Sequence, residues 1–180
     1  MRLFVAIELP EAVKAELERI SCGLPRARWV PADQRHLTLS FIGEVDGAEL
    51  DSIIAGLETV RASAFSLQLK GVGCFPPRRD PRVLWVGVER SDPLVEFKKK
   101  IDRALNRAGI TPDSRKFFPH ITLARVAKTP IGRTARFLAE HSGFTLPPFV
   151  ITSFLLFSSR LTPDGAIHHP EAEFPLENLM

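Results

Sequence analysis

The chain carries one short pattern twice, as His36-Leu37-Thr38-Leu39 and as His120-Ile121-Thr122-Leu123, 84 residues apart in 180. Each copy lies in a segment that alternates apolar and polar residues, RHLTLSFI (35–42) and HITLARV (120–126), as a half-buried strand does. A predicted helix follows each segment. A repeat that spans nearly half of the chain indicates two copies of one β-α-β unit rather than a solenoid, whose repeats are shorter.

Strand geometry decides which side chains of the repeat act together. Residues two apart in a strand share a face, so His36 and Thr38 point one way while Leu37 and Leu39 point the other. His120 and Thr122 behave in the same manner. The aliphatic side chains must face a core. If the two halves pack with approximate two-fold symmetry, the polar pairs face each other across one groove.

Two imidazoles and two hydroxyls suit acid-base chemistry on an anion. Imidazole titrates near neutral pH, so one histidine can be neutral while its partner is protonated. Threonine hydroxyls can donate hydrogen bonds to an oxyanion. A phosphate between the histidines could be attacked by water on one side and lose an alkoxide on the other, which is the in-line geometry of phosphoryl transfer. This chemistry needs neither a metal nor a cofactor.

The elements outside the repeat predict an α+β protein. Apolar residues at helical spacing predict helices over 10–22, 47–60, 93–108 and 133–141. Alternating or short apolar runs predict further strands over 3–9, 65–72, 83–88, 149–158 and 166–176, and the Pro- and Arg-rich segment 73–82 is expected to be a loop. No linker separates these elements. We therefore expect one domain over 1–180, built of two lobes with a break near residues 90–93.

Composition is that of an ordinary soluble domain. Hydrophobic residues make up 44%, charged residues 25%, and the formal net charge is +3, which suits an anionic ligand without proving one. Cys22 and Cys74 are too few for a disulfide framework and show no metal-ligand spacing, so we expect reduced thiols in the cytoplasm. No apolar run approaches the length of a membrane span, and the N-terminal segment is too charged for a secretory signal.

Two rival classes compete with a two-histidine phosphoesterase. A metal hydrolase would show a spacing such as H-E-x-x-H or paired cysteines, and none is present. A non-catalytic module that binds RNA 3′ ends would need cations, not two groups that titrate near neutrality. Either tetrapeptide alone is a weak motif with a high rate of false matches. The repeat and its matched strand context favour the enzyme.

The chain resembles the 2H phosphoesterase superfamily, named for two His-x-Thr/Ser-x motifs. It is most similar to the RNA 2′,3′-cyclic phosphodiesterases, also called 2′-5′ RNA ligases. The resemblance runs nearly end to end and includes RLFVAIELP (2–10), HLTLSFIGEV (36–45), GVGCFP (71–76), PRVLWVGV (81–88) and FFPHITLAR (117–125). It implies two lobes related by a pseudo-two-fold axis, with antiparallel sheets lining a central cleft and helices outside.

The resemblance also implies the reaction. A 2′,3′-cyclic phosphate on RNA, or on a cyclic nucleotide, is opened to a 2′-phosphomonoester in RNA processing. His36 is then the proton donor to O3′ and His120 the proton acceptor from water, although the motif is symmetric and the roles could be exchanged. Thr38, Thr122 and Arg125 are expected to bind phosphate, since a guanidinium fork matches its oxygens. The same acid and base would serve 2′-5′ ligation, so both directions stay open. We expect a monomer.

Two positions need a choice between roles. In related enzymes an aromatic residue at the position of Phe41 can approach the nucleobase, whereas strand alternation predicts that Phe41 packs in the core with Leu37 and Leu39. Related chains often carry a Tyr in their last strand, and this chain has none. His168 and His169 stand there instead; they could substitute for that Tyr in ligand contact, but we expect an exposed pair.

Overall fold

The computed structural model describes residues 1–77, 80–113, 115–163 and 165–178. In chain order, these residues form β1 (Arg2–Glu8), α1 (Glu11–Ile20), β2 (Arg28–Trp29), the short 3-10 turn η1 (Ala32–Gln34), β3 (His36–Glu44), α2 (Gly47–Glu58), β4 (Phe65–Leu67), β5 (Leu69–Phe75), β6 (Val83–Val88), α3 (Asp92–Arg107), β7 (His120–Arg125), α4 (Ile131–Glu140), β8 (Phe149–Ile151), β9 (Ser153–Thr162) and β10 (Gly165–Pro175). All four predicted helices are present within two residues of their predicted ends.

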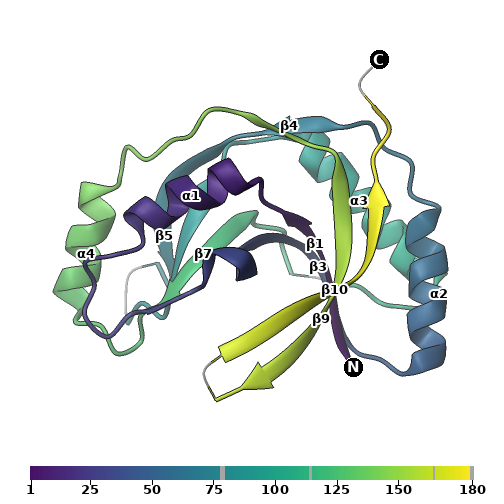
Figure 1. Cartoon of the computed structure of the whole chain (residues 1–180), viewed down its shortest axis with the longest axis horizontal. Coiled ribbons are helices and arrows are strands. Elements are labelled where there is room, and N and C mark those ends of the chain that lie inside the picture. The colour runs from purple at the N-terminus through teal and green to yellow at the C-terminus, as the bar shows by residue number, and fades with distance from the viewer. Residues whose placement is uncertain (78–79, 114, 164, 179–180) are drawn as a thin grey trace.

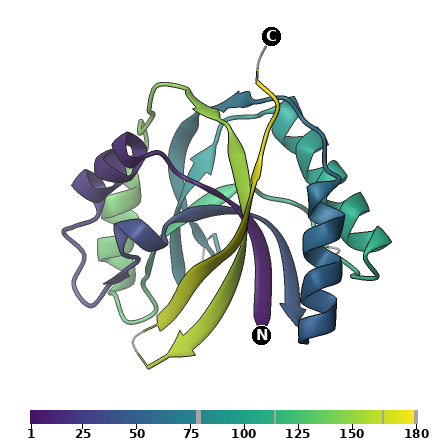
Figure 2. The same cartoon turned by 45° about the vertical axis from the view of Figure 1, so that its right-hand side comes forward.

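The main sheet runs through the middle of the molecule. Its strands follow the order β10-β9-β1-β3-β7-β6-β5, with β2 beside β7, and every pair is antiparallel. Helices α1 and α4 lie near the β5–β7 end, and α2 and α3 lie at the opposite end (Figures 1 and 2). The predicted α+β class with antiparallel strands in two duplicated halves is confirmed.

The two halves of the sheet meet at one register pair. β3 and β7 pair only through Leu37 opposite Ile121, and both side chains are buried. Those two residues are the second positions of the two repeated motifs. The approximate two-fold axis therefore passes between the motifs, and sheet pairing itself brings the two copies together.

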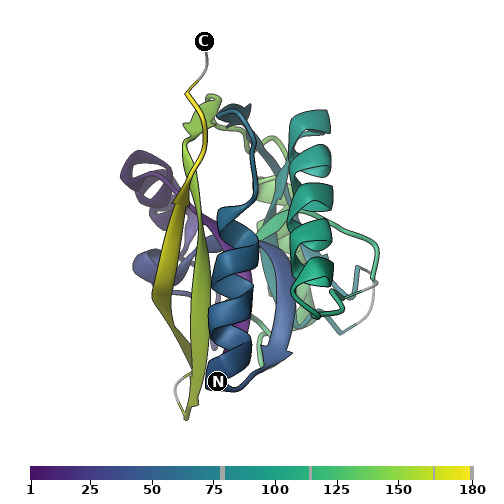
Figure 3. The ribbon, with the colours of Figure 1, turned by 90° about the vertical axis from the view of Figure 1, so that its right-hand side faces the viewer.

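Helix packing explains the buried side of the sheet. The predicted apolar stripe of α3, namely Leu94, Phe97, Ile101 and Leu105, is buried. Helix α2 begins with a capping box, in which the side chains of Asp46 and Glu49 each accept a backbone N–H from the other residue. In the side view, α2 and α3 stand next to each other (Figure 3), which covers the apolar face of this end of the sheet.

Several strand boundaries differ from the prediction, including the end of β9, which lies at Thr162 instead of at residue 158. The segment 65–72 breaks at Gln68, so that β4 pairs with β8 in a separate two-stranded sheet while β5 joins the main sheet. The segment 149–158 breaks at Thr152 in the same way. Both were predicted as single strands because a change of sheet partner at one residue leaves the alternation nearly intact. β5 also extends to Phe75, into the predicted loop, because Cys74 and Phe75 pair with β6.

The predicted break near residues 90–93 does not coincide with a division in the sheet. β6 precedes this segment and β7 follows it, yet the two strands pair along their length. The placement of a lobe boundary there stays a prediction. In the part of the chain that the structure describes, no helix combines the length and apolar character needed to cross a membrane.

Candidate active site

The two motif strands have the same pattern of burial. In β3 and in β7 the histidine and threonine are partly exposed, while the residue between them and the residue after the threonine are buried. Alternation predicted this placement. With Leu37 opposite Ile121, antiparallel geometry sets His36 across from Thr122, and Thr38 across from His120. The two histidines are then diagonal neighbours on one face. The Cα atoms of such diagonal neighbours lie roughly 7–8 Å apart.

Each histidine is held by a backbone carbonyl two residues before it. His36 Nδ1 lies 2.9 Å from the Gln34 carbonyl oxygen, and His120 Nδ1 lies 2.7 Å from that of Phe118. A carbonyl oxygen only accepts, so Nδ1 donates in both rings. The proton of the neutral ring is therefore on Nδ1, which leaves Nε2 free. Both Nε2 atoms can accept a proton when neutral and donate one when charged.

A bulge follows the threonine in each motif strand. Against β1, Thr38 pairs with Ala6 and Ser40 with Val5, so Leu39 has no partner of its own. Against β6, Thr122 pairs with Trp85 and Ala124 with Leu84, which leaves Leu123 in the same position. An extra residue of this kind shifts the alternation by one. The fifth residue after each motif histidine therefore returns to the face that carries the histidine.

The bulge corrects the prediction for Phe41. Alternation assigned its ring to the core, but Phe41 is 50% exposed, and Ser40 is buried instead. Phe41 corresponds to Arg125 in the second repeat, which is also exposed. The two repeats thus offer an aromatic ring on one side and a guanidinium on the other, on the face that carries the histidines and threonines.

Aromatic rings surround both histidines. The His36 ring lies 4.8 Å from Phe4 and 6.0 Å from Phe157, between ring centroids. Around His120 the corresponding distances are 5.1 Å to Phe75, 6.1 Å to Phe118 and 6.4 Å to Trp85. Sequence patterns indicated none of the rings around His120, because Phe75 and Trp85 lie on separate strands and no motif singles out Phe118, two residues before the histidine.

His36 lies in surroundings that disfavour its charged form. Burial, followed by the nearby charge of His168 and more weakly that of His120, lowers the pKa of His36 to about 4, although the hydrogen bond to Gln34 opposes this. His168 also departs from the expectation drawn from the sequence. We expected an exposed pair, but His168 is partly buried, and only His169 is exposed.

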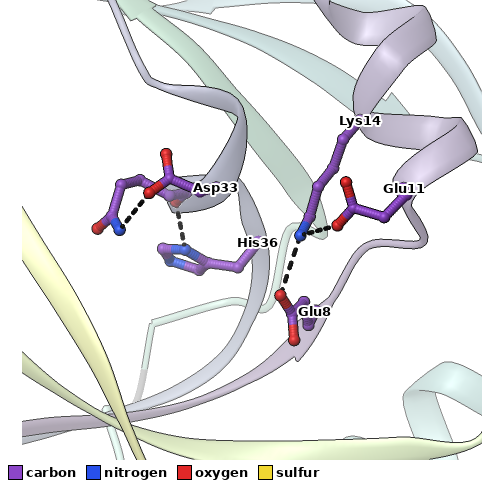
Figure 4. Close-up of polar contacts among 6 residues, drawn as sticks. Glu8, Glu11, Lys14, Asp33 and His36 are labelled. Carbon is purple, nitrogen blue, oxygen red and sulfur yellow. Dashed lines mark hydrogen bonds and ion pairs between the residues drawn. The ribbon is translucent and has the colours of Figure 1, made fainter.

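The carboxylate opposite His36 is bound by a lysine. Glu8 on β1 pairs with His36 in register. Its Oε1 accepts a hydrogen bond of 2.9 Å from Lys14 Nζ, which also donates to Glu11 at 2.9 Å. Figure 4 shows the three side chains together, with the His36 ring apart from them. Lys14 is 5% exposed and thus holds the Glu8 carboxylate in an ion pair instead of leaving it free beside the imidazole.

Other features of the described surface do not compete with this site. Two hollows lie beside the start of α3 and contain no motif residue, so the central cleft implied by the resemblance stays a prediction. Within the described ranges, no three His, Cys, Asp or Glu side chains are grouped as metal ligands. The candidate site is distinguished by its chemistry and symmetry.

Comparisons with known proteins agree on one family. The sequence pattern of the family described as LigT like Phosphoesterase matches residues 7–85 and again 86–168. The RNA 2′,3′-cyclic phosphodiesterase of Thermotoga maritima is 36% identical over 174 residues, covering 93% of this chain and 91% of that protein. That of Archaeoglobus fulgidus is 31% identical over 172 residues, covering 93% and 96%.

Solved structures show the same fold. TT0787 of Thermus thermophilus superposes with a TM-score of 0.82 at 28% identity and covers 99% of both chains. E. coli LigT in complex with 3′-AMP superposes with a TM-score of 0.77 at 26% identity, covering 97% of both chains.

Proposed function

The chain belongs to the LigT-like phosphoesterase family, and we propose on this premise that it hydrolyses RNA 2′,3′-cyclic phosphate ends to 2′-phosphomonoesters. One observation carries the proposal. The register pair between Leu37 and Ile121 brings two His-x-Thr motifs to one face, with both Nε2 atoms free. Cyclic nucleotides, which present the same five-membered phosphate ring, are substrates of the same kind.

In the proposed reaction, water attacks phosphorus opposite O3′. His120 Nε2 takes a proton from the water as the new P–O bond forms. The P–O3′ bond breaks, and protonated His36 Nε2 gives its proton to the departing O3′. The phosphate stays on O2′. Solvent then returns the proton from His120 to His36, which restores the starting state without a metal or a cofactor.

The threonines and Arg125 have a separate task in this proposal. Charge on the phosphate oxygens grows in the transition state, and donors already aimed at those oxygens stabilise it. The Thr38 and Thr122 hydroxyls lie on the face of the two imidazoles. Arg125, exposed on the same face, supplies a forked donor for phosphate. Phe41 occupies the corresponding place in the other repeat, where its exposed ring can stack on the terminal nucleobase.

The low pKa of His36 fits the role of donor once an anion is bound. Protonation of a group with a pKa of about 4 at pH 7 costs about 4 kcal/mol. A phosphate charge about 4 Å away contributes roughly 4 kcal/mol at the effective dielectric of a protein surface. The substrate itself therefore supplies the energy that charges His36. The empty site holds a neutral imidazole, and binding is accompanied by proton uptake.

The remaining partners follow from the same reasoning. Both histidines come from one chain, so we propose that a monomer is active. The thiols of Cys22 and Cys74 are free, which supports a reducing compartment, and we propose the cytoplasm.

The test is incubation with an oligonucleotide that ends in a 2′,3′-cyclic phosphate, followed by phosphorus NMR. We expect a 2′-phosphate product, with strongly reduced activity in His120→Ala and full activity in His169→Ala, which removes an exposed histidine. A 3′-phosphate would refute the assigned direction of attack. Tight binding without turnover would instead support an RNA 3′-end binding module. A parallel reaction with a 5′-hydroxyl RNA detects 2′-5′ ligation.

A further inference from the structure

His168 contacts His36 although 132 positions separate them in the chain. The two ring centroids are 5.0 Å apart and the rings are perpendicular, at 89°. His168 also meets the Phe4 ring edge-on, with centroids 4.9 Å apart, and Phe4 in turn lies 4.8 Å from His36. Rings in these arrangements attract each other and restrict each other's rotation. The rings of His36, His168 and Phe4 therefore form one cluster, in which every pair of centroids lies 4.8–5.0 Å apart.

Gln34 connects the same two histidines through hydrogen bonds. Its backbone carbonyl accepts from His36 Nδ1 at 2.9 Å, and its side-chain Oε1 accepts from the His168 backbone N–H at 2.7 Å. The other end of the amide, Nε2, donates to Asp33 at 3.4 Å. Both ends of the amide are thus engaged, which fixes its orientation. One residue of η1 sets the tautomer of His36 and also attaches the edge strand β10 beside it.

His168 has little capacity to carry charge. Its Nδ1 is buried and has no hydrogen-bond partner among the described residues. A proton on this atom would lack an acceptor, and a positive charge would lie beside His36. Burial, and then the charge of His169, lower the pKa of His168. A neutral ring at this position excludes water from His36 without offering it a counter-charge.

Among the residues that the structure describes, no neighbouring element supplies a free counter-charge to this pair. On β1, Glu8 is bound to Lys14, and Phe4 is apolar. On β9, the residue paired with His168 is Ser159, and Phe157 packs on His36. The titratable groups that act on His36 are His168 on β10 and His120 on β7, and both oppose its protonation. His169, the neighbour of His168 on β10, acts only on His168.

We propose that His168 is a positioning residue for His36: held by Gln34, it fixes the imidazole and excludes water from it, so that His36 stays uncharged until an anionic phosphate binds. The proposal rests on the proposed function, in which His36 is the proton donor. It assigns β10 a part in the site that neither motif contains. It also predicts that His36 is neutral in the empty site and becomes protonated only when substrate binds.

The experiment is a proton–carbon NMR titration of the histidine rings between pH 3.5 and 8, with the His36 signal assigned by its absence in His36→Gln. In the unaltered protein, His36 should titrate at about 4. In His168→Ala its midpoint should rise by about one pH unit or more, since water then reaches the ring. In His168→Phe, which keeps the packing, the His36 midpoint should stay below that of an ordinary histidine. His169→Ala is the matched control, in which the His36 midpoint should not change.

Activity provides a second readout. The acid limb of kcat/KM reports the lower of the two essential pKa values of the free enzyme. It should move to higher pH in His168→Ala, and His168→Phe should restore it in part. If His168→Ala does not fold, Gln34→Ala tests the same proposal, because it removes the hydrogen bond that holds His168 without altering either imidazole. The His36 midpoint should rise in this variant too.

The outcomes separate the two proposals. A His36 midpoint near 6.5 in the unaltered protein, or equal shifts in His168→Ala and His169→Ala, would overturn the role of His168. Neither result depends on turnover, so the proposed hydrolysis would still stand. Conversely, a low His36 midpoint that rises in His168→Ala supports the positioning role even if the substrate proves to be a different phosphate ester.

Discussion

The low pKa of His36 makes the stability of the fold depend on pH. In the unfolded chain a histidine titrates near 6.5, whereas in the folded protein burial and the neighbouring histidines lower the pKa of His36 to about 4. Below pH 6.5 the unfolded state therefore binds a proton that the folded state does not bind. Because such a proton favours the unfolded state, the free energy of unfolding falls as the pH falls from 6.5 to 4 and this contribution is constant below 4.

The magnitude follows from the width of that window. Each pH unit is worth about 1.4 kcal/mol for one group, so the full effect is about 3 kcal/mol, and the part between pH 6.5 and 5 is about 2 kcal/mol. His36→Gln removes the titration and keeps a donor that can reach the Gln34 carbonyl. Between pH 6.5 and 5, the free energy of unfolding of this variant should therefore fall by about 2 kcal/mol less than that of the unaltered protein.

Urea unfolding at several pH values between 7 and 5 measures the difference. The interval lies above the range in which carboxylates such as Glu89 and Glu140, whose pKa values are lowered by Lys70 and Arg136 respectively, affect stability. Their contributions are also common to both proteins. His169→Gln, an exposed site, serves as the control and should follow the unaltered protein. Parallel stability curves for His36→Gln and the unaltered protein would show that His36 titrates normally, and the electrostatic reasoning would then be refuted.

Loss of either motif histidine should impair chemistry more than folding. His36→Ala and His120→Ala should each reduce kcat by about 10²–10⁴-fold, and the double variant by less than the product, because both act on one transition state; a folded variant with full single-turnover activity would refute the two-histidine mechanism. Arg125→Ala should lower kcat/KM by roughly 10–100-fold through loss of a charge-assisted hydrogen bond, with partial recovery in Arg125→Lys, as measured on a cyclic nucleotide. Turnover should be unchanged in excess EDTA, and an activity that is lost there and restored by zinc or manganese would contradict the metal-independent reaction.

Local sequence patterns were sufficient wherever the deciding interactions lie within one element. The helices were predicted well because an apolar stripe such as that of α3 repeats every three to four residues, whatever it packs against. The faces of His36 and His120 were predicted for the same reason, since alternation along a strand is local. The repeat also indicated that the two motifs lie opposite each other, which is the relation that the pair Leu37 and Ile121 creates.

Predictions failed where a neighbouring strand sets the geometry. Phe41 was assigned to the core because alternation has no means of recording a bulge, which arises from the register of β3 against β1. The strand breaks at Gln68 and Thr152 have a similar origin, because each residue lies where the chain leaves one sheet for the other. These features depend on pairing partners that are distant in the sequence.

The amino-acid sequence by itself determined the two His-x-Thr motifs, the strands that carry them, the helices and the α+β class, because each depends on the order of residues within a short segment. Only the tertiary structure decided that Phe41 faces the site and that His168 packs on His36. The physical reason is that His168 reaches His36 through the pairing of β10 with β9 and of β9 with β1. A contact between residues 132 positions apart exists only after those strands have paired.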